Sequence, residues 1–245
     1  MRFNNKTVIV TGAAGGIGLA IAQRFNSEGA NIVMADINMD KLKEAATQVQ
    51  SANKSIPLLY ECDVSSEQQV QLTVAAAIDS FGAIDIIVNN AGLMIFKKLE
   101  EHTAEDWDRI LNVDLMGAFY FTKHAFLNMK NGGAIINISS IHAIETTPMV
   151  TTYAAAKAAL LSLTRSSSIE GKQKGIRVNA ILPGAIDTPM LWENPNIKAG
   201  LEQVSKDSVG KPEDIAAVAA FLASDDAAFV QGAMIEVDGG RLDRL

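Results

Sequence analysis

The stretch TVIVTGAAGGIGLA, residues 7–20, decides how the rest of the chain is interpreted. A short β-branched run leads into Gly12, Gly16 and Gly18, and an apolar helical pattern follows. Glycines at such a turn let the backbone approach a pyrophosphate, and the free N–H groups of the helix N-terminus attract its negative charge. The spacing is G-x-x-x-G-x-G, and its position between strand and helix favours a dinucleotide-binding turn over a plain connection.

Short apolar runs alternate with helical patterns along the whole chain. The runs begin at Thr7, Asn31, Pro57, Asp85, Gly133 and Ile176, and a last one, AMIEVDGG, lies near the C-terminus. Each is nearly continuous in apolar residues, as expected for parallel strands that are covered on both faces. The pattern predicts an α/β fold with one domain over residues 1–245, a doubly wound, seven-stranded parallel sheet flanked by helices. The least regular region, residues 184–211, is the predicted mobile substrate flap.

The composition narrows the class of protein. The 245 residues are 48% hydrophobic, enough for a large core, and carry a formal net charge of −7. Because Lys and Arg are scattered in an acidic chain, we expect neither a nucleic-acid partner nor a membrane partner. The single cysteine, Cys62, fits a reducing compartment. No apolar run is long enough for a signal peptide or a membrane span, so we expect a cytoplasmic protein.

Polar residues follow the predicted strands where a nucleotide would lie. Asp36 ends the second run, where a carboxylate can accept hydrogen bonds from an adenosine ribose diol and repel a 2′-phosphate. Alternatively, Asp36 caps the next helix, although Asn38 could fill that role. Asp63, after the third run, either reads the adenine amino group or caps the helix that follows it. NNAG, residues 89–92, ends the fourth run with small residues that let the backbone pass close to a ligand.

The segment YAAAK, residues 153–157, puts a phenol and an ammonium one helical turn apart. A surface helix with a snorkelling Lys explains such a pair equally well when it stands alone. Here Ser140 lies 13 residues earlier, at the end of the fifth run. Together with TGAAGGIG, NNAG, LNVDLMGAF and PGAIDT, in this order and spacing, these residues resemble the short-chain dehydrogenase/reductase family from Lys6 to about Gly240. The resemblance implies a Rossmann fold and an enzyme that transfers hydride between a nicotinamide cofactor and a secondary alcohol or ketone.

The same resemblance implies roles for individual residues. The catalytic residues would be Ser140, Tyr153 and Lys157, with Asn112 holding a water that links Lys157 to solvent. A helical Asn bonded to local backbone is the alternative for Asn112. Physically, a tyrosine is a poor base near neutral pH, and a nearby ammonium lowers its pKa. The implied cofactor-binding residues are Gly12, Gly16, Ile17, Gly18, Asp36, Asp63, Val64, Asn90, Ala91, Gly92, Tyr153, Lys157, Pro183, Gly184, Ile186 and Thr188.

The cofactor and the substrate are predicted less directly. Asp36, with no Arg or Lys in the glycine turn, favours NAD over NADP. The expected substrate is an alcohol or ketone that is small and polar, cyclic or sugar-like. The residues expected to face it are Ser140, His142, Tyr153, Met190 and Trp192, although His142 could also be a solvated loop residue. We expect no metal site, because the histidines lack neighbouring ligand residues.

Two other functions fit parts of the sequence. A 3-oxoacyl-[acyl-carrier-protein] reductase shares the motifs, but such enzymes usually prefer NADP and carry an arginine near the start of the fifth strand, where this chain has Ala134. A non-catalytic nucleotide sensor on the same fold is the third hypothesis, and the intact Ser140, Tyr153 and Lys157 weigh against it.

Family members are usually tetramers or dimers, and the apolar, small-residue helix AAAKAALLSL leads us to expect a homotetramer with two-fold interfaces.

Overall fold

A single parallel sheet runs through the molecule in this computed structural model, which describes residues 1–53, 56–200, 204 and 209–242. The sheet has seven strands in the order β3-β2-β1-β4-β5-β6-β7, with a crossover from β3 back to β4 beside β1. The doubly wound α/β fold predicted from the sequence is therefore confirmed. The strands are β1 (Thr7–Thr11), β2 (Asn31–Asp36), β3 (Leu58–Glu61), β4 (Ile86–Asn89), β5 (Gly133–Ile138), β6 (Ile176–Pro183) and β7 (Met234–Val237).

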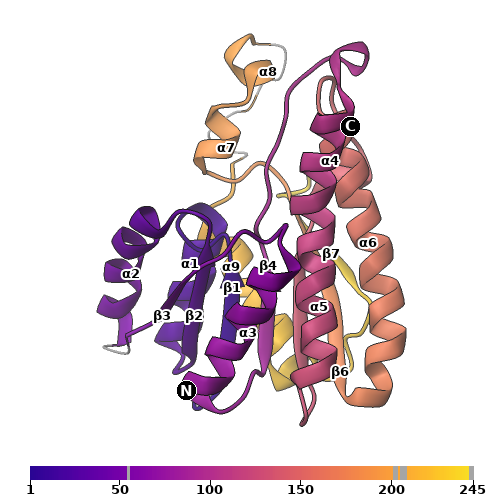
Figure 1. The fold of residues 1–245 in the computed structure, drawn as a ribbon. Helices are drawn as coiled ribbons and strands as arrows, with labels where there is room; N and C mark the ends of the chain where they lie inside the picture. The colour runs from indigo at the N-terminus through magenta and orange to yellow at the C-terminus, as the bar shows by residue number, and fades with distance from the viewer. Residues whose placement is uncertain (54–55, 201–203, 205–208, 243–245) are drawn as a thin grey trace.

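Helices cover both faces of the sheet (Figure 1). Along β1, Val8 and Val10 pack toward one group of helices, and Ile9, which points to the other face, packs toward another. Successive strand residues point to opposite faces, so a strand covered on both sides must be apolar throughout. The longer helices are α1 (Gly16–Ser27), α2 (Met39–Asn53), α3 (Glu67–Phe81), α4 (Ala104–Leu111), α5 (Gly117–Asn128), α6 (Thr151–Gly171) and α9 (Pro212–Ala223).

A π-helical turn and a pair of short helices lie close to the carboxyl ends of the strands. Between α4 and α5, residues Asn112–Met116 form a π-helical turn, η2, so the two helices continue almost as one column beside α6 (Figure 1). After β6, the short helices α7 (Pro189–Trp192) and α8 (Pro195–Lys198) rise beyond the edge of the sheet (Figure 1). Part of the predicted flap, residues 201–203 and 205–208, lies outside the described residues.

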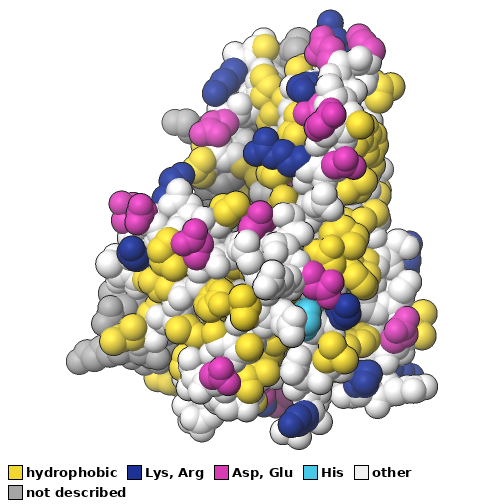
Figure 2. Space-filling view, viewed as in Figure 1, with side chains coloured by type: hydrophobic (Ala, Val, Ile, Leu, Met, Phe, Trp, Pro, Cys, Tyr) yellow, Lys and Arg dark blue, Asp and Glu magenta, His cyan; other side chains and the backbone are white. Residues whose placement is uncertain are grey.

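The surface carries charge of both signs. Acidic and basic side chains are interspersed over the face seen in Figure 2. Hydrophobic side chains also gather there, over the region of α4 and α5, and Phe119 and Leu127 on α5 are among the exposed ones. None of the helices in the described ranges combines the length and apolar character needed to cross a membrane.

Candidate active site

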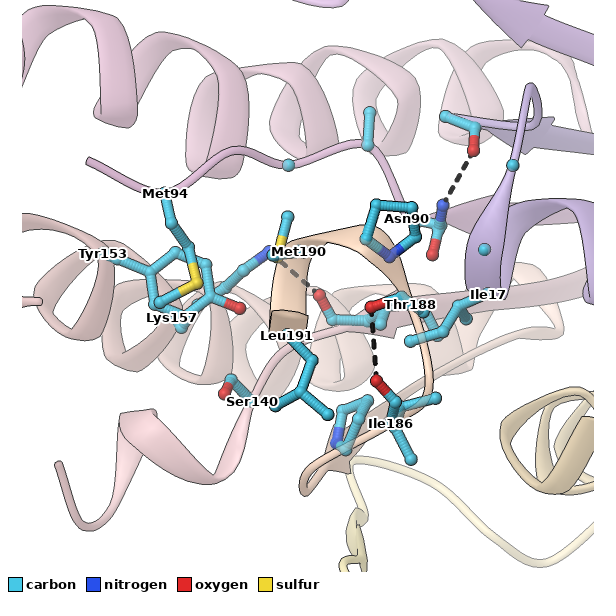
Figure 3. Close-up of a pocket in the computed structure, with 18 of the residues that line it drawn as sticks. Ile17, Asn90, Met94, Ser140, Tyr153, Lys157, Ile186, Thr188, Met190 and Leu191 are labelled. Atoms are coloured by element: carbon cyan, nitrogen blue, oxygen red, sulfur yellow. Dashed lines mark hydrogen bonds between the residues drawn. The ribbon is translucent and has the colours of Figure 1, made fainter. Parts of the chain in front are cut away.

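A cavity of about 630 Å³ opens at the carboxyl ends of the strands. Its wall joins the glycine turn after β1, the segments after β4, β5 and β6, and the first turns of α6. In doubly wound sheets, ligands bind at this edge, where the strand order reverses. Figure 3 shows Ser140, Tyr153 and Lys157 on one side of the cavity and Ile17 and Asn90 on the other.

The glycine turn is shaped by positive backbone angles and by the segment after β4. Gly12 has φ +63°, a left-handed conformation that favours glycine. The Asn90 side-chain amide donates to the carbonyls of Thr11 (2.9 Å) and Gly12 (3.2 Å), which ties NNAG to the turn. Gly18 lies behind the wall, where an added Cβ would come within 2.2 Å of the Gly12 carbonyl oxygen. Its predicted role in cofactor binding is therefore indirect, through the close packing of α1 on the turn.

Asp36 lies on the cavity wall and is not the cap of the next helix. Its Oδ2 accepts a hydrogen bond from the Ala14 N–H (3.1 Å), and its Oδ1 accepts one from the Asn38 N–H (3.0 Å). Asn38 caps α2 instead, because its Oδ1 accepts from the Lys41 N–H at 3.0 Å. The Asp36 carboxylate is thus fixed against the glycine turn, and Lys41 lines the same end of the cavity.

The structure does not bring Asp63 or Val64 to the cavity wall. Asp63 Oδ1 accepts hydrogen bonds from the Ser65 backbone N–H (2.9 Å) and hydroxyl (2.7 Å), which makes a local turn before α3. Val64 is buried and packs against Gly117, where a Cβ would come within 2.9 Å of the valine side chain. The alternative prediction, that Asp63 caps the next helix, is also wrong, because Ser66 is the N-cap of α3 and its hydroxyl accepts from the Gln69 N–H at 3.4 Å. The remaining predicted cofactor residues all line the cavity: Gly12, Gly16, Ile17, Asp36, Asn90, Ala91, Gly92, Tyr153, Lys157, Pro183, Gly184, Ile186 and Thr188.

Ser140, Tyr153 and Lys157 converge from two elements that are distant in sequence. Ser140 follows β5, whereas Tyr153 and Lys157 lie one turn apart near the start of α6. The Lys157 ammonium donates to the Ile138 carbonyl (3.1 Å) and lies 5.6 Å from the centre of the Tyr153 ring. Ser139 donates its hydroxyl to the Lys157 carbonyl (3.0 Å), so this side chain secures the β5–α6 packing. Because the Ser139 hydroxyl is used in this packing contact, Ser140 is the serine that remains for the substrate, as the sequence analysis predicts.

Asp114, and not Asn112, is the residue next to Lys157, which corrects the prediction from sequence. Asp114 Oδ2 lies 3.2 Å from the Lys157 ammonium, and the aspartate is 1% exposed. Its Oδ1 accepts a hydrogen bond from the Leu93 N–H at 3.0 Å. Asn112 is exposed at the beginning of η2 and does not line the cavity. The burial pattern offered a signal: Asp114 falls four residues after Ile110 and three before Gly117, on the stripe that a helix buries.

Burial dominates the electrostatics of this cluster. Desolvation raises the pKa of Tyr153 above its usual value, Asp114 adds to the rise, and Lys157 and Ser140 oppose it. Burial lowers the pKa of Lys157, but the charges of Asp114 and Tyr153 outweigh that effect and the net direction is upward. The ammonium therefore acts on the pKa of Tyr153 in the expected downward direction, but burial, with a smaller contribution from Asp114, outweighs it and the net direction is upward.

The substrate end of the cavity is mostly apolar. His142 and Met190 line it as expected, and the His142 ring lies 6.0 Å from the Tyr153 ring in an edge-on arrangement. Trp192 does not line it, because its indole N–H donates to Asp187 Oδ1 at 2.7 Å and holds the ring away. Asn194 and Arg241 line the cavity but were missed from the sequence. Arg241 follows the last predicted strand, and the rule that ligands lie at the carboxyl edge of the sheet could have found it.

Comparisons with known proteins agree with this architecture. A family model described as Enoyl-(Acyl carrier protein) reductase matches residues 12–241. The 3beta-hydroxysteroid dehydrogenase 1 of Eggerthella lenta is 41% identical over 244 residues, covering 96% of this chain and 93% of the relative. The 3-oxoacyl-[acyl-carrier-protein] reductase FabG of Thermotoga maritima is 35% identical over 244 residues, covering 98% and 99%. A solved 7 alpha-hydroxysteroid dehydrogenase complexed with NADH and 7-oxo glycochenodeoxycholic acid is 34% identical, with a TM-score of 0.90 and coverage of 98% and 95%.

The chain belongs to the short-chain dehydrogenase/reductase family. It is an oxidoreductase that acts on alcohol groups and uses a nicotinamide cofactor. The glycine turn fits such a cofactor, because a Cβ on Gly15 would meet no atom within 4 Å apart from those of its own chain neighbours. That part of the wall is bare backbone at the N-terminus of α1, the surface that a pyrophosphate needs.

Proposed function

We propose that this protein is an NAD-dependent dehydrogenase/reductase that interconverts a secondary alcohol and a ketone. The observation that carries the proposal is that Ser140, Tyr153 and Lys157 share one cavity with the glycine turn and Asp36. A nucleotide and a small alcohol can therefore meet in a single site. The proposed substrate is small and polar, cyclic or sugar-like, and the apolar wall formed by Met94, Ile141, Met190 and Leu191 favours a cyclic one.

In this proposal, the residues of the chain handle the proton and the orientation of the substrate. The nicotinamide, when bound, supplies the hydride acceptor or donor. Tyr153 gives a proton to the substrate oxygen during reduction and takes it back during oxidation. The Ser140 hydroxyl holds the same oxygen, and Lys157 orients the tyrosine and binds the nicotinamide ribose. Ile186, through its backbone N–H, and Thr188, through its hydroxyl, are proposed to hold the carboxamide.

The preference for NAD rests on Asp36. Its carboxylate is anchored by two backbone N–H groups at the cavity wall, where it can pair with the ribose hydroxyls and repel a 2′-phosphate. Lys41 lines the same end and weakens that repulsion. We therefore propose discrimination between the two cofactors and not exclusion of NADP.

A carrier-protein reductase is the second candidate, and the similarity to the Thermotoga maritima enzyme favours it. Two features of this chain weigh against it. Asp36 lies where a phosphorylated cofactor would carry negative charge, and Ala134 on β5 is buried where such reductases usually carry an arginine. A non-catalytic nucleotide sensor is disfavoured by the converged Ser140, Tyr153 and Lys157.

One experiment tests these alternatives together. A panel of alcohols, ketones and a 3-oxoacyl thioester is assayed with NAD(H) and with NADP(H) by the absorbance of the reduced nicotinamide. We expect cyclic secondary alcohols or their ketones to be turned over with NAD(H), and Tyr153→Phe to remove that activity. Preferential use of the thioester with NADPH would favour the carrier-protein reductase. Nucleotide binding without turnover of any panel member would favour the sensor.

We also propose a homotetramer and a substrate flap over residues 184–211. The surface of α6 exposes small residues such as Ala155 and Ala158, and the neighbouring α5 exposes Phe119 and Leu127. Such a surface packs closely against a second copy through a two-fold contact. A sedimentation mass near the 26.1 kDa of one chain at micromolar concentration would contradict the tetramer.

The proposed flap is supported by Met190, Leu191 and Asn194, which reach the cavity wall from α7 and the residues that flank it.

A further inference from the structure

The segment after β7 forms a turn that holds an arginine on the cavity wall. Gly239 and Gly240 have φ +67° and +75°, a left-handed conformation that glycine adopts without strain. The Asp238 carboxylate accepts hydrogen bonds from the Gly240 N–H (2.9 Å) and from the Leu242 N–H (2.8 Å). One carboxylate therefore fixes the backbone on both sides of Arg241, and Arg241 lines the cavity.

The contacts of this turn place Arg241 at the substrate end of the cavity. Leu242 packs against the apolar cluster that contains Ile141, the residue after Ser140. In the sheet, β7 lies four strands from β1, roughly 19 Å at a spacing of ~4.8 Å, and the surface suited to a pyrophosphate is at the start of α1, directly after β1. The position of Arg241 therefore suits contact with a substrate held by Ser140 and not with the cofactor phosphates.

Arg241 differs in its surroundings from the other two cations on the described wall. Lys41 lies at the nucleotide end beside Asp36, and the Lys157 ammonium lies 3.2 Å from Asp114 Oδ2. Among the described lining residues, Asp36 is the one carboxylate, and it belongs to β2, on the other side of β1 from β7 in the sheet order. An arginine keeps its charge at any physiological pH, and its planar fork of N–H donors matches a carboxylate. The substrate end therefore presents a positive charge on a largely apolar wall.

We propose that the substrate carries a carboxylate, which Arg241 binds through a bidentate ion pair while the reacting carbon faces Ser140 and Tyr153. The inference rests on the proposed function for the reacting end of the substrate and adds a second point of recognition. The substrate class becomes a cyclic hydroxy acid and its keto acid. Met94 and Leu191 on the apolar wall contact the ring between the two polar ends. Because the turn is fixed before binding, little side-chain and backbone ordering opposes the ion pair.

The kinetic test compares 3- and 4-oxocyclohexanecarboxylate with their carboxamides, with NADH as the reductant. The carboxamide keeps the ring and the shape of the group and removes its charge. For the wild type, we expect kcat/KM of the better acid to exceed that of its amide by roughly 10- to 100-fold, the range of hydrogen bonds to charged groups. The difference should lie mainly in KM, because the carboxylate does not change during the reaction and is bound equally in the ground and transition states.

Three variants assign this preference to Arg241. Arg241→Gln should bring the ratio of acid to amide close to one, and Arg241→Lys should keep part of it, because lysine retains the charge without the fork. Arg109→Gln removes an exposed arginine of α4 away from the cavity and should keep the wild-type ratio. An equal loss for acid and amide in Arg241→Gln, a rise only in the KM of NADH, or a wild-type ratio near one would overturn the proposal.

A binding measurement separates this inference from the proposed function. Cyclohexanecarboxylate and cyclohexanecarboxamide, which have no reacting oxygen on the ring, are titrated by calorimetry into the protein saturated with NADH. We expect tighter binding of the carboxylate to the wild type and loss of that difference in Arg241→Gln. If this result is obtained but no alcohol or ketone is turned over, the proposed function fails and the carboxylate site stands. If neutral ketones are reduced but neither carboxylate is preferred, the carboxylate site fails and the proposed function stands.

Discussion

The two ends of the cavity are built in different ways. The nucleotide end consists of the glycine turn and Asp36, whose contacts are mainly to backbone groups nearby in the sheet. The chemical end consists of side chains from η2, the segment after β5, α6 and the segment after β6, which come from distant parts of the sequence. A local motif is therefore enough to locate the first end, whereas the second exists only once the helices have packed.

The largest effect should come from a change that breaks the chemical end alone. Tyr153→Phe keeps the buried ring and removes the hydroxyl, so we expect a loss of roughly 10²–10⁴-fold in turnover. Cofactor affinity, measured by fluorescence titration, should remain close to that of the wild type, because the glycine turn and Asp36 are untouched. Turnover above about a tenth of the wild type would refute the role assigned to Tyr153.

At the nucleotide end, Asp36→Ala should change selectivity and leave the chemistry intact. A charge–charge interaction of about 1–3 kcal/mol at intermediate dielectric corresponds to roughly 5- to 150-fold in catalytic efficiency in favour of NADH for the wild type. The variant should narrow that ratio, mainly through the KM of NADPH, with kcat preserved. Lys41→Ala is the opposing variant, because it removes the positive charge at the same end and should widen the ratio. A wild type that uses NADPH better than NADH would contradict the ribose role of Asp36.

Gly18→Ala tests whether the packing behind the turn holds the nucleotide end in shape. Its Cβ would stand 2.2 Å from the Gly12 carbonyl oxygen, so backbone must move. Overpacking of this kind typically costs about 1–3 kcal/mol of unfolding free energy. We expect a lower Tm and weaker cofactor binding. Gly15→Ala is the matched control for stability, since its Cβ meets open space and its backbone is extended. Equal Tm values for the two variants would show that the turn relaxes freely.

The smallest effects on kcat/KM should come from Met190 and Trp192, two residues of the proposed flap of which only Met190 lines the cavity. Met190 lines the substrate end, so Met190→Ala should reduce kcat/KM by about tenfold for an apolar cyclic substrate. Trp192→Phe removes the hydrogen bond to Asp187, and we expect less than about a twofold change in kcat/KM, since a contact outside the site is not part of substrate binding. A larger loss in Trp192→Phe than in Met190→Ala would mean that the indole turns inward when substrate is bound.

Much of the fold followed from local pattern. Six apolar runs and AMIEVDGG became the seven strands of one sheet, because strands covered on both faces must be apolar at consecutive positions. The close approach of Gly18 to the Gly12 carbonyl involves residues near in sequence, whereas Asn90, which ties the turn in place, comes from the segment after β4. Ser140, Tyr153 and Lys157 were placed through the family resemblance, and the structure brings them to one cavity.

Other assignments needed contacts that a linear pattern does not contain. Asn112 and Asp114 are two residues apart, and only the π-helical turn and its packing on α6 decide that the aspartate faces Lys157. Trp192 was expected at the substrate but donates a hydrogen bond to Asp187, whereas Asn194 reaches the cavity wall from a segment with no recognisable motif.

The sequence by itself determined the sheet, the glycine turn and the kinds of groups available for hydride-transfer chemistry. The tertiary structure decided which polar groups lie buried together and what charge surrounds Tyr153. The physical reason is range: strand and turn preferences act over a few residues, whereas the desolvation and Coulomb energies that set a buried pKa depend on every element packed around the group.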